Sequence, residues 1–127
     1  MNTDSLIQVS HLYRYYGTTC AVKDVSFEVR RGEVLGFLGP NGAGKSSTMQ
    51  VITGNLAPSA GSVSINGVDI LEKPREAKAS LGYLPEQPPV YKEFTVDEYL
   101  RFCAHLNRIP RANVAAAVAR AKERCGL

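Results

Sequence analysis

The stretch from Gly39 to Ser47, which reads GPNGAGKSS, restricts the folds open to this chain more than any other feature of its sequence. It contains the pattern G-x-x-x-x-G-K-[ST], in which a glycine-rich loop joins a buried strand to a helix. The residues that match the pattern are Gly39, Gly44, Lys45 and Ser46. Residues 34–38 precede the loop and are apolar without alternation, which is typical of a strand buried on both faces in a parallel sheet. Residues 45–52 read as a helix, so the sequence predicts an α/β fold with the loop between strand and helix.

Each residue type of the loop suits the binding of a triphosphate. Gly42 and Gly44 let the backbone turn with its N–H groups pointing inward, and a Cβ atom at either position would crowd the anion. The helix that begins near Lys45 adds unpaired N–H groups, and the lysine ammonium can reach the terminal phosphates. The hydroxyl of Ser46 can ligate Mg²⁺, and Ser47 can donate a hydrogen bond to an inner phosphate. The predicted phosphate-binding residues are Gly39, Pro40, Asn41, Gly42, Ala43, Gly44, Lys45, Ser46 and Ser47.

The composition is that of an ordinary globular domain, with 44% apolar and 21% charged side chains among 127 residues. The net charge of +3 is small and the basic residues are spread along the chain, so we expect no nucleic-acid partner. The three cysteines form no C-x-x-C pair, which indicates reduced thiols. No stretch approaches the roughly 20 apolar residues that cross a bilayer, so any membrane contact is expected to come through a partner.

The remaining sequence divides into short predicted elements. Asn66-Gly67 separates two apolar alternations and predicts a hairpin over residues 63–70. Thr95 and Glu98 have the spacing of a capping box, which predicts a helix that begins there. The other predicted elements are strands over residues 6–16, 25–30 and 81–84, a short helix over residues 74–80 and a helix over residues 111–124.

The segments LYRYYG, VKDVSFEVRRGEVLGFLGPNGAGKSS and GYLPEQPPVYKEFTVDEYLRF resemble the N-terminal half of the ATP-binding subunit of ABC transporters. The resemblance covers nearly the whole chain, and the YLPE, PPVY and TVDEYL segments are most similar to subunits that serve ABC-2-type exporters. It implies a P-loop NTPase fold of the ABC ATPase type, with an N-terminal antiparallel β subdomain, the start of a helical subdomain and an incomplete core. Within residues 1–127, the β subdomain and loop core are expected over about residues 1–93, and the start of the helical subdomain over about residues 94–127.

The same resemblance implies a function and its partners. ATP and Mg²⁺ would be bound, and in the full-length protein ATP hydrolysis would drive transport across a membrane. The expected partners are a transmembrane permease subunit and a second nucleotide-binding subunit, which would hold the protein at the inner face of the cell membrane.

The resemblance also gives Tyr16 a role, because Tyr16 matches the aromatic residue of the family that stacks on adenine. Stacking on a flat aromatic face is physically sound for a base. The alternative is a tyrosine that only packs in an edge strand. Tyr13 and Tyr15 compete for the role, and strand alternation places Tyr16 on the face opposite both.

The position after Pro85 departs from the family pattern. The family usually has glutamine there, which meets Mg²⁺ and the attacking water, whereas this chain has Glu86 with Gln87 one residue later. A carboxylate can bind Mg²⁺ but cannot donate a hydrogen bond unless it is protonated. Glu86 and Gln87 are therefore candidate residues of this loop, and a solvated pair without catalytic role is the alternative.

Other parts of a complete ATPase of this family are not recognisable in the sequence. There is no LSGGQ-like signature, no apolar run that ends in Asp-Glu and no switch histidine. We therefore expect a fragment that binds ATP without hydrolysing it, because phosphoryl transfer also needs a positioned nucleophile. Two alternatives stay open, namely a soluble ABC-type ATPase of DNA repair or translation and a non-functional truncated remnant.

Overall fold

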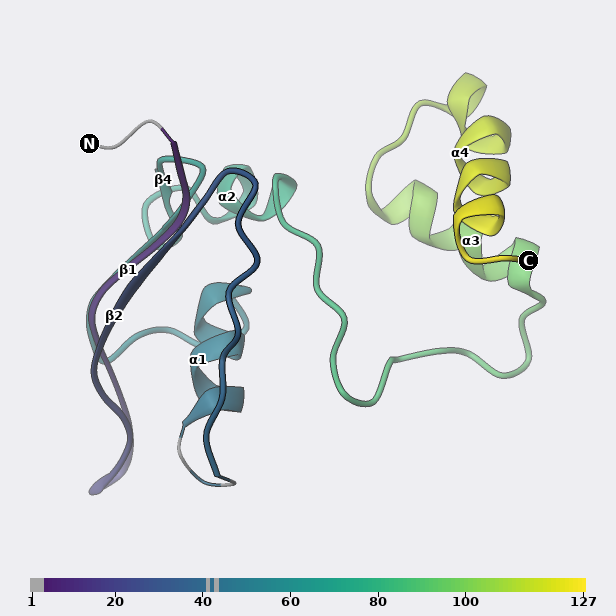
Figure 1. The fold of residues 1–127 in the computed structure, drawn as a ribbon. Coiled ribbons are helices and arrows are strands. Elements are labelled where there is room, and N and C mark those ends of the chain that lie inside the picture. The colour runs from purple at the N-terminus through teal and green to yellow at the C-terminus, as the bar shows by residue number, and fades with distance from the viewer. Residues whose placement is uncertain (1–3, 41, 43) are drawn as a thin grey trace. The chain divides into compact units, whose positions relative to one another are not determined.

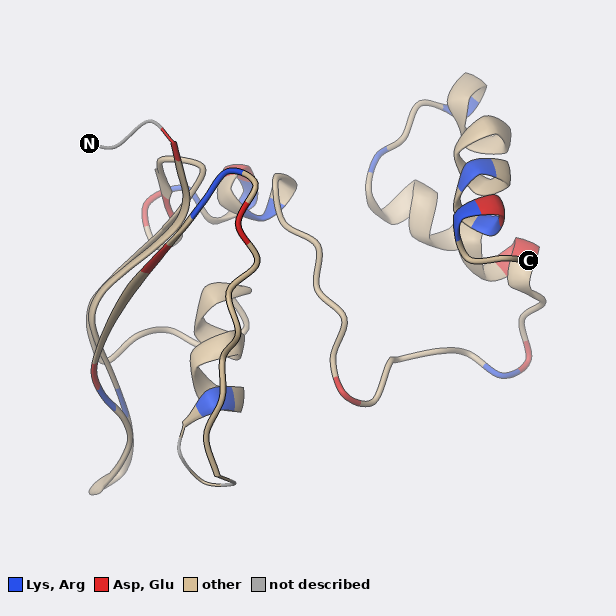
Figure 2. Cartoon of the chain, in the orientation of Figure 1, with Lys and Arg blue, Asp and Glu red and all other residues tan. Residues whose placement is uncertain are grey.

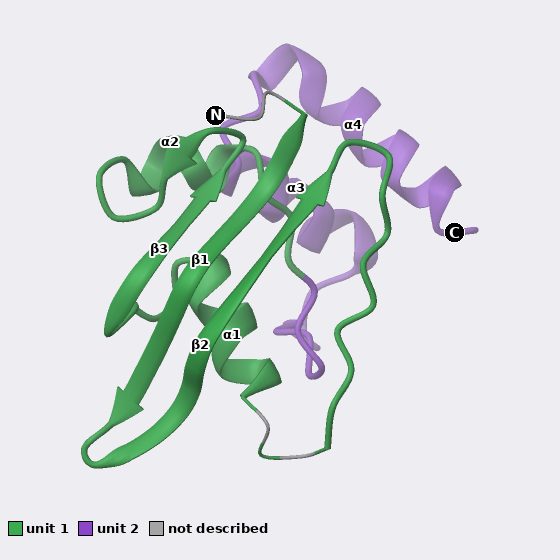
Figure 3. Cartoon of the chain, turned by 60° about the vertical axis from the view of Figure 1, so that its left-hand side comes forward, with its two compact units in different colours: residues 1–83 green, residues 84–127 purple. Residues whose placement is uncertain are grey.

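The computed structural model describes residues 4–40, 42 and 44–127. They form two compact units, residues 1–83 and residues 84–127, each of which is described by itself (Figure 3). The boundary expected near residue 93 is one between two subdomains of the family. The division at residue 83 does not test it, so it stays a prediction.

The first unit is built on a four-stranded antiparallel sheet with the order β2-β1-β3-β4, of which Figure 3 shows β2, β1 and β3 side by side. Its strands are β1 (Ser5–Tyr16), β2 (Thr19–Arg30), β3 (Ala60–Ile65) and β4 (Val68–Asp69). The strands predicted over residues 6–16 and 25–30 are confirmed, although the second begins earlier, directly after the turn at Gly17-Thr18. The predicted hairpin is also confirmed, and Asn66 and Gly67 adopt φ of 51° and 80°, as its turn requires.

The core of this unit lies between the sheet and α1 (Lys45–Ile52), whose prediction is confirmed (Figure 1). Simple alternation would place Val9 and Leu12 on opposite faces of β1. A bulge at His11, which has a φ of 48°, shifts the alternation so that both side chains are buried in the core. The buried apolar residues are Val9, Leu12, Val22, Val51, Ile52, Val63, Ile65, Ile70 and Ala77, the last from α2 (Pro74–Ala79).

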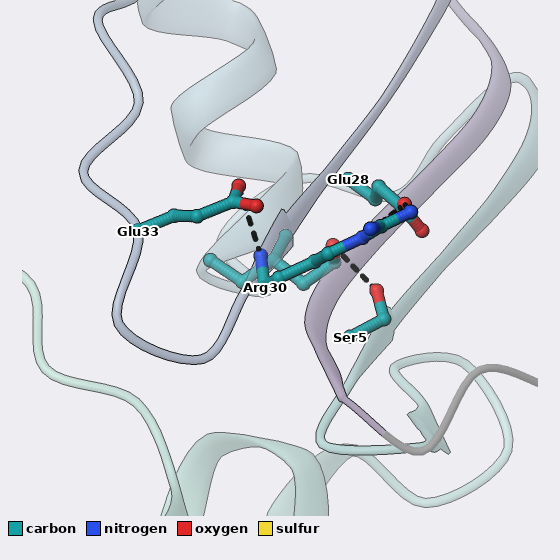
Figure 4. A network of polar contacts seen from close by, with 5 residues as sticks. Ser5, Glu28, Arg30 and Glu33 are labelled. Atoms are coloured by element: carbon teal, nitrogen blue, oxygen red, sulfur yellow. Dashed lines mark hydrogen bonds and ion pairs between the residues drawn. The ribbon is translucent and has the colours of Figure 1, made fainter.

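A polar network fixes the turn at which the chain leaves β2. The Arg30 guanidinium donates to Glu28 at 2.8 Å, and this bond raises the pKa of Arg30 (Figure 4). The Arg30 N–H donates to Glu33 Oε2 at 3.3 Å, and the Glu33 N–H donates back to the Arg30 carbonyl at 3.1 Å. The turn at residues 31–33 is therefore held by side-chain and backbone bonds together.

Two predicted strands are wrong. Residues 34–38 and 81–84 are not paired with any strand in the part of the chain that the structure describes. Val34 and Leu38 are 99% and 94% exposed, whereas Phe37 packs on Phe27 with 5.4 Å between ring centroids. An apolar run becomes a parallel strand only beside a neighbouring strand, and no such neighbour occurs among the residues that the structure describes. This observation agrees with the incomplete core that the resemblance implies.

The second unit is a pair of helices, α3 (Val96–Leu106) and α4 (Arg111–Arg124), and both predictions are confirmed. The Thr95 hydroxyl accepts the N–H of Glu98 at 3.1 Å, as the capping pattern predicts. Ala104, Val114 and Val118 are buried between the helices. Among the described residues, no helix combines the length and apolar character needed to span a membrane.

Candidate nucleotide-binding site

The glycine-rich loop connects the extended residues 34–38 to α1. Of its predicted phosphate-binding residues, Gly39, Pro40 and Gly42 are exposed, whereas Gly44 and Lys45 are half-buried. Asn41 and Ala43 lie outside the described residues. Within the described part, the loop therefore opens to solvent on one side and continues into the first turn of α1 on the other.

Gly44 is the N-cap of α1 and can only be glycine. Its φ is +90°, in the left-handed region that side chains disfavour, and a Cβ atom would lie 2.3 Å from the Ala21 carbonyl oxygen of β2. Gly42 has a φ of +86° but no described atom within 4 Å of a Cβ, so its constraint comes from the backbone conformation. The contact between Gly44 and β2 fixes the start of α1 against the sheet, which the sequence did not reveal.

Lys45 brings the positive charge of the site. Its ammonium donates to the Gly39 carbonyl oxygen, so that the side chain folds back over the loop. Lys45 is the one charged residue in the sequence of α1, where Figure 2 shows a single basic position at the start of the helix. The basic residues are otherwise spread over both units (Figure 2).

The backbone adds donors at the same place. The Thr48 N–H donates to the Gly44 carbonyl at 2.9 Å and is the first bond along α1. The N–H groups of the preceding helical residues have no acceptor within the helix, and they lie at the positive end of its dipole. Loop, lysine and helix end thus present converging donors suited to an anion.

The two serines differ in their surroundings. Ser46 is exposed in the first turn of α1, whereas Ser47 is half-buried. The Ser47 Oγ lies 3.3 Å from the Tyr16 hydroxyl, within hydrogen-bond distance. The structure therefore connects the start of α1 to the end of β1, which places the predicted base-stacking residue beside the loop.

Tyr16 is the tyrosine of β1 that reaches the loop. Tyr13 and Tyr15 stack on each other, with 6.4 Å between ring centroids and an interplanar angle of 3°. A hydrogen bond with Cys20 raises the pKa of Tyr15. Tyr16 instead contacts Ser47 and Arg14, and its side chain stays 44% exposed. These contacts agree with the alternation expected from the sequence and leave Tyr16 open to a ligand.

Arg14 also belongs to this site, although the sequence did not predict it. Its guanidinium carbon lies 4.8 Å from the centroid of the Tyr16 ring. The available signal was the spacing, because residues two apart in a strand share a face. The spacing does not show that the guanidinium and the ring are in contact, because contact also depends on the rotamers of both side chains.

Glu86 and Gln87 are exposed and follow Pro85 in a bend of the second unit. The phosphate-binding loop belongs to the first unit, whereas Glu86 and Gln87 belong to the second. Their role stays a prediction.

The sequence matches the protein family described as ABC transporter over residues 22–126. It is 38% identical over 99 residues to the probable multidrug ABC transporter ATP-binding protein YbhF of Escherichia coli (strain K12), a match that covers 78% of this chain and 17% of YbhF. It is 31% identical over 122 residues to the linearmycin resistance ATP-binding protein LnrL of Bacillus subtilis (strain 168), covering 96% of this chain and 39% of LnrL. The chain thus spans well under half of these relatives.

Two solved structures of ABC transporter proteins are also similar to this chain. One described as an ATP binding subunit of an ABC transporter matches with a TM-score of 0.77 and 37% identity over 85% of this chain and 45% of that one. The structure of cbiO1 from Clostridium perfringens, described as part of the ABC transporter complex cbiONQ, matches with a TM-score of 0.83 and 28% identity. That match covers 98% of this chain and 51% of cbiO1.

Proposed function

The chain belongs to the ABC transporter family, and on this premise we propose that its loop from Gly39 to Ser47 binds the triphosphate of ATP. The predicted family and the ABC ATPase fold class are confirmed by these similarities. One observation carries the proposal for the site itself. At the start of α1, a position that admits only glycine, a folded-back lysine and a serine beside Tyr16 occur together.

The triphosphate fits this arrangement by charge and by donor geometry. The backbone N–H groups at the start of α1 bind inner phosphate oxygens, and the Lys45 ammonium binds the terminal ones. Binding replaces the bond from Lys45 to the Gly39 carbonyl by a stronger one, because a phosphate oxygen carries charge and a carbonyl oxygen does not.

The residues present also fit Mg²⁺. Ser46 offers a hydroxyl oxygen that is exposed in the first turn of α1, and magnesium takes oxygen ligands together with phosphates and water. Glu86 is a second candidate ligand by its carboxylate alone. When bound, Mg²⁺ would neutralise charge on the phosphate oxygens.

Tyr16 is the residue proposed to stack on the adenine of ATP. Its ring is partly exposed at the end of β1 and its hydroxyl lies beside Ser47, so a base stacked on it would belong to a nucleotide whose phosphates reach α1. Stacking of a base on an aromatic side chain contributes about 1–3 kcal/mol.

In the longer protein, the proposed role is that of the nucleotide-binding subunit that couples ATP hydrolysis to transport. One relative is named as a probable multidrug ABC transporter ATP-binding protein and another as a linearmycin resistance ATP-binding protein. Both names support an exporter. The proposed partners are a transmembrane permease subunit and a second nucleotide-binding subunit, which would place the protein at the inner face of the membrane. The names of two relatives refer to an ABC transporter and to an export system, so a soluble repair or translation ATPase is the less favoured reading.

Replacement of two tyrosines of β1, one at a time, tests whether Tyr16 stacks on the base. Tyr16→Leu is expected to weaken ATP binding about tenfold, which corresponds to about 1.4 kcal/mol of lost stacking. Binding of inorganic tripolyphosphate, which has no base, should stay unchanged in the same calorimetric titration. Tyr15→Leu is the matched control, because Tyr15 is the adjacent residue in β1 but stacks on Tyr13. Equal losses of ATP affinity in both variants would contradict the role of Tyr16.

A further inference from the structure

The Arg14 side chain is held in an unusual setting beside Tyr16. Its Nη1 donates to the carbonyl oxygen of Ala57 at 2.8 Å, in the segment that follows α1. Its guanidinium carbon lies 4.8 Å from the centroid of the Tyr16 ring, within the range of a cation–π contact. Arg14 therefore joins the end of β1 to the loop after α1 and covers one face of the Tyr16 ring.

This position is energetically unfavourable for one atom of the side chain. Arg14 Nε is enclosed and has no hydrogen-bond partner among the described residues. Leaving a buried donor unsatisfied costs about 1–3 kcal/mol. An apolar side chain of similar length would fill the same place without that cost, so stability alone does not explain an arginine here.

The consequence of the contact is that Tyr16 is held at two points. Arg14 contacts the ring, and Ser47 Oγ lies 3.3 Å from the hydroxyl. A tyrosine that is 44% exposed would otherwise distribute among about three staggered χ1 wells. When the ring is already held in one rotamer, the free energy of base binding is not reduced by the cost of selecting that rotamer.

We propose that Arg14 is a positioning residue for the nucleobase, which fixes the Tyr16 ring so that its other face receives the base of the nucleotide. This inference rests on the proposed function, because it needs ATP in the site. Arg14 acts through Tyr16 and contributes to the base-dependent part of the affinity. It contributes nothing to the binding of the phosphates.

The magnitude follows from two estimates that agree. Release of Tyr16 into about three rotamers lowers the fraction in the competent state, and the apparent affinity falls by the same factor, about threefold. A cation–π contact at a partly exposed site accounts for about two- to fivefold. We therefore expect Arg14→Met to weaken ATP binding about threefold and to leave tripolyphosphate binding unchanged.

A double-mutant cycle tests the mechanism by calorimetric titration of the full chain with ATP and with inorganic tripolyphosphate. Arg14→Met, Tyr16→Leu and the double variant are compared with the unmodified chain. If Arg14 acts through Tyr16, Arg14→Met has no further effect in the Tyr16→Leu background. Arg14→Lys keeps a cation that can contact the Tyr16 ring, so it should bind ATP within about twofold of the unmodified chain. The melting temperature of Arg14→Met should stay within about 3 °C of the unmodified value, because the lost contacts are offset by relief of the buried Nε.

The outcomes separate the inference from the proposed function. ATP binding that Arg14→Met leaves unchanged, or weakens equally in the Tyr16→Leu background, overturns the inference alone. An equal loss for tripolyphosphate also overturns it, because the charge would then act on the phosphates. Failure of the unmodified chain to bind either ligand overturns the proposed function and the inference with it.

Discussion

Replacement of Lys45 by alanine is expected to weaken the binding of ATP and of tripolyphosphate by between about tenfold and 150-fold. The removed group is the ammonium that folds over the loop at the start of α1. A hydrogen bond to a charged partner contributes about 1.5–3 kcal/mol, and each 1.4 kcal/mol is a factor of ten. Alanine is a strong helix former, so α1 should persist. Calorimetric titration measures the affinities, and circular dichroism verifies the helix.

Lys23→Ala is the matched control for Lys45→Ala. Lys23 is exposed on β2 of the same unit, so its replacement removes the same charge without touching the loop. We expect an affinity within about twofold of the unmodified chain at physiological salt, because exposed charges at a distance are screened. Similar losses in the two variants would show a general effect of charge and contradict a specific role for Lys45.

Gly44→Ala is expected to have the largest effect on the folded structure. The added Cβ would lie 2.3 Å from the Ala21 carbonyl oxygen, at a φ of +90°. A non-glycine residue held in such a conformation costs about 1–3 kcal/mol, and the clash with β2 adds to this cost. We expect the free energy of unfolding of the first unit to fall by roughly 2–4 kcal/mol and nucleotide binding to be lost. Urea unfolding, followed by circular dichroism, measures the change.

Gly36→Ala provides the comparison for Gly44→Ala. Gly36 lies in the extended segment before the loop, its φ is not positive, and a Cβ there would meet no described atom within 4 Å. Its replacement should leave both stability and affinity within about 0.5 kcal/mol of the unmodified chain. If Gly44→Ala behaved in the same way, the contact between Gly44 and β2 would not fix the start of α1.

The sequence predicted those elements whose signals are local. Asn66-Gly67 has the backbone preferences of its turn, and Thr95 provides its own hydrogen-bond acceptor, so neither needs the rest of the fold. The loop could be assigned because its residue types follow from the chemistry of phosphate. Features of this kind can be predicted because they depend on residues that are close together in the sequence.

Features that depend on non-local partners could not be predicted in the same way. Residues 34–38 have the pattern of a buried parallel strand, but all except Phe37 are exposed, because no described strand lies beside them. The Arg14 side chain that contacts Tyr16 also donates to the carbonyl of Ala57, and the exclusion of side chains at Gly44 depends on Ala21. Both contacts join segments that are distant in the sequence, and a local pattern does not reveal them.

The most direct test of the central claim, that the loop from Gly39 to Ser47 binds the phosphates of ATP, is a titration of the ¹⁵N-labelled chain with ATP and Mg²⁺, followed by amide NMR. The amide signals of Gly44, Lys45 and Ser46 should shift most, because their N–H groups would donate to phosphate oxygens. Tripolyphosphate should move the same amides, and ATP alone should also move signals near Tyr16. Saturable binding that leaves these amides in place, or no binding at millimolar ATP, would contradict the account.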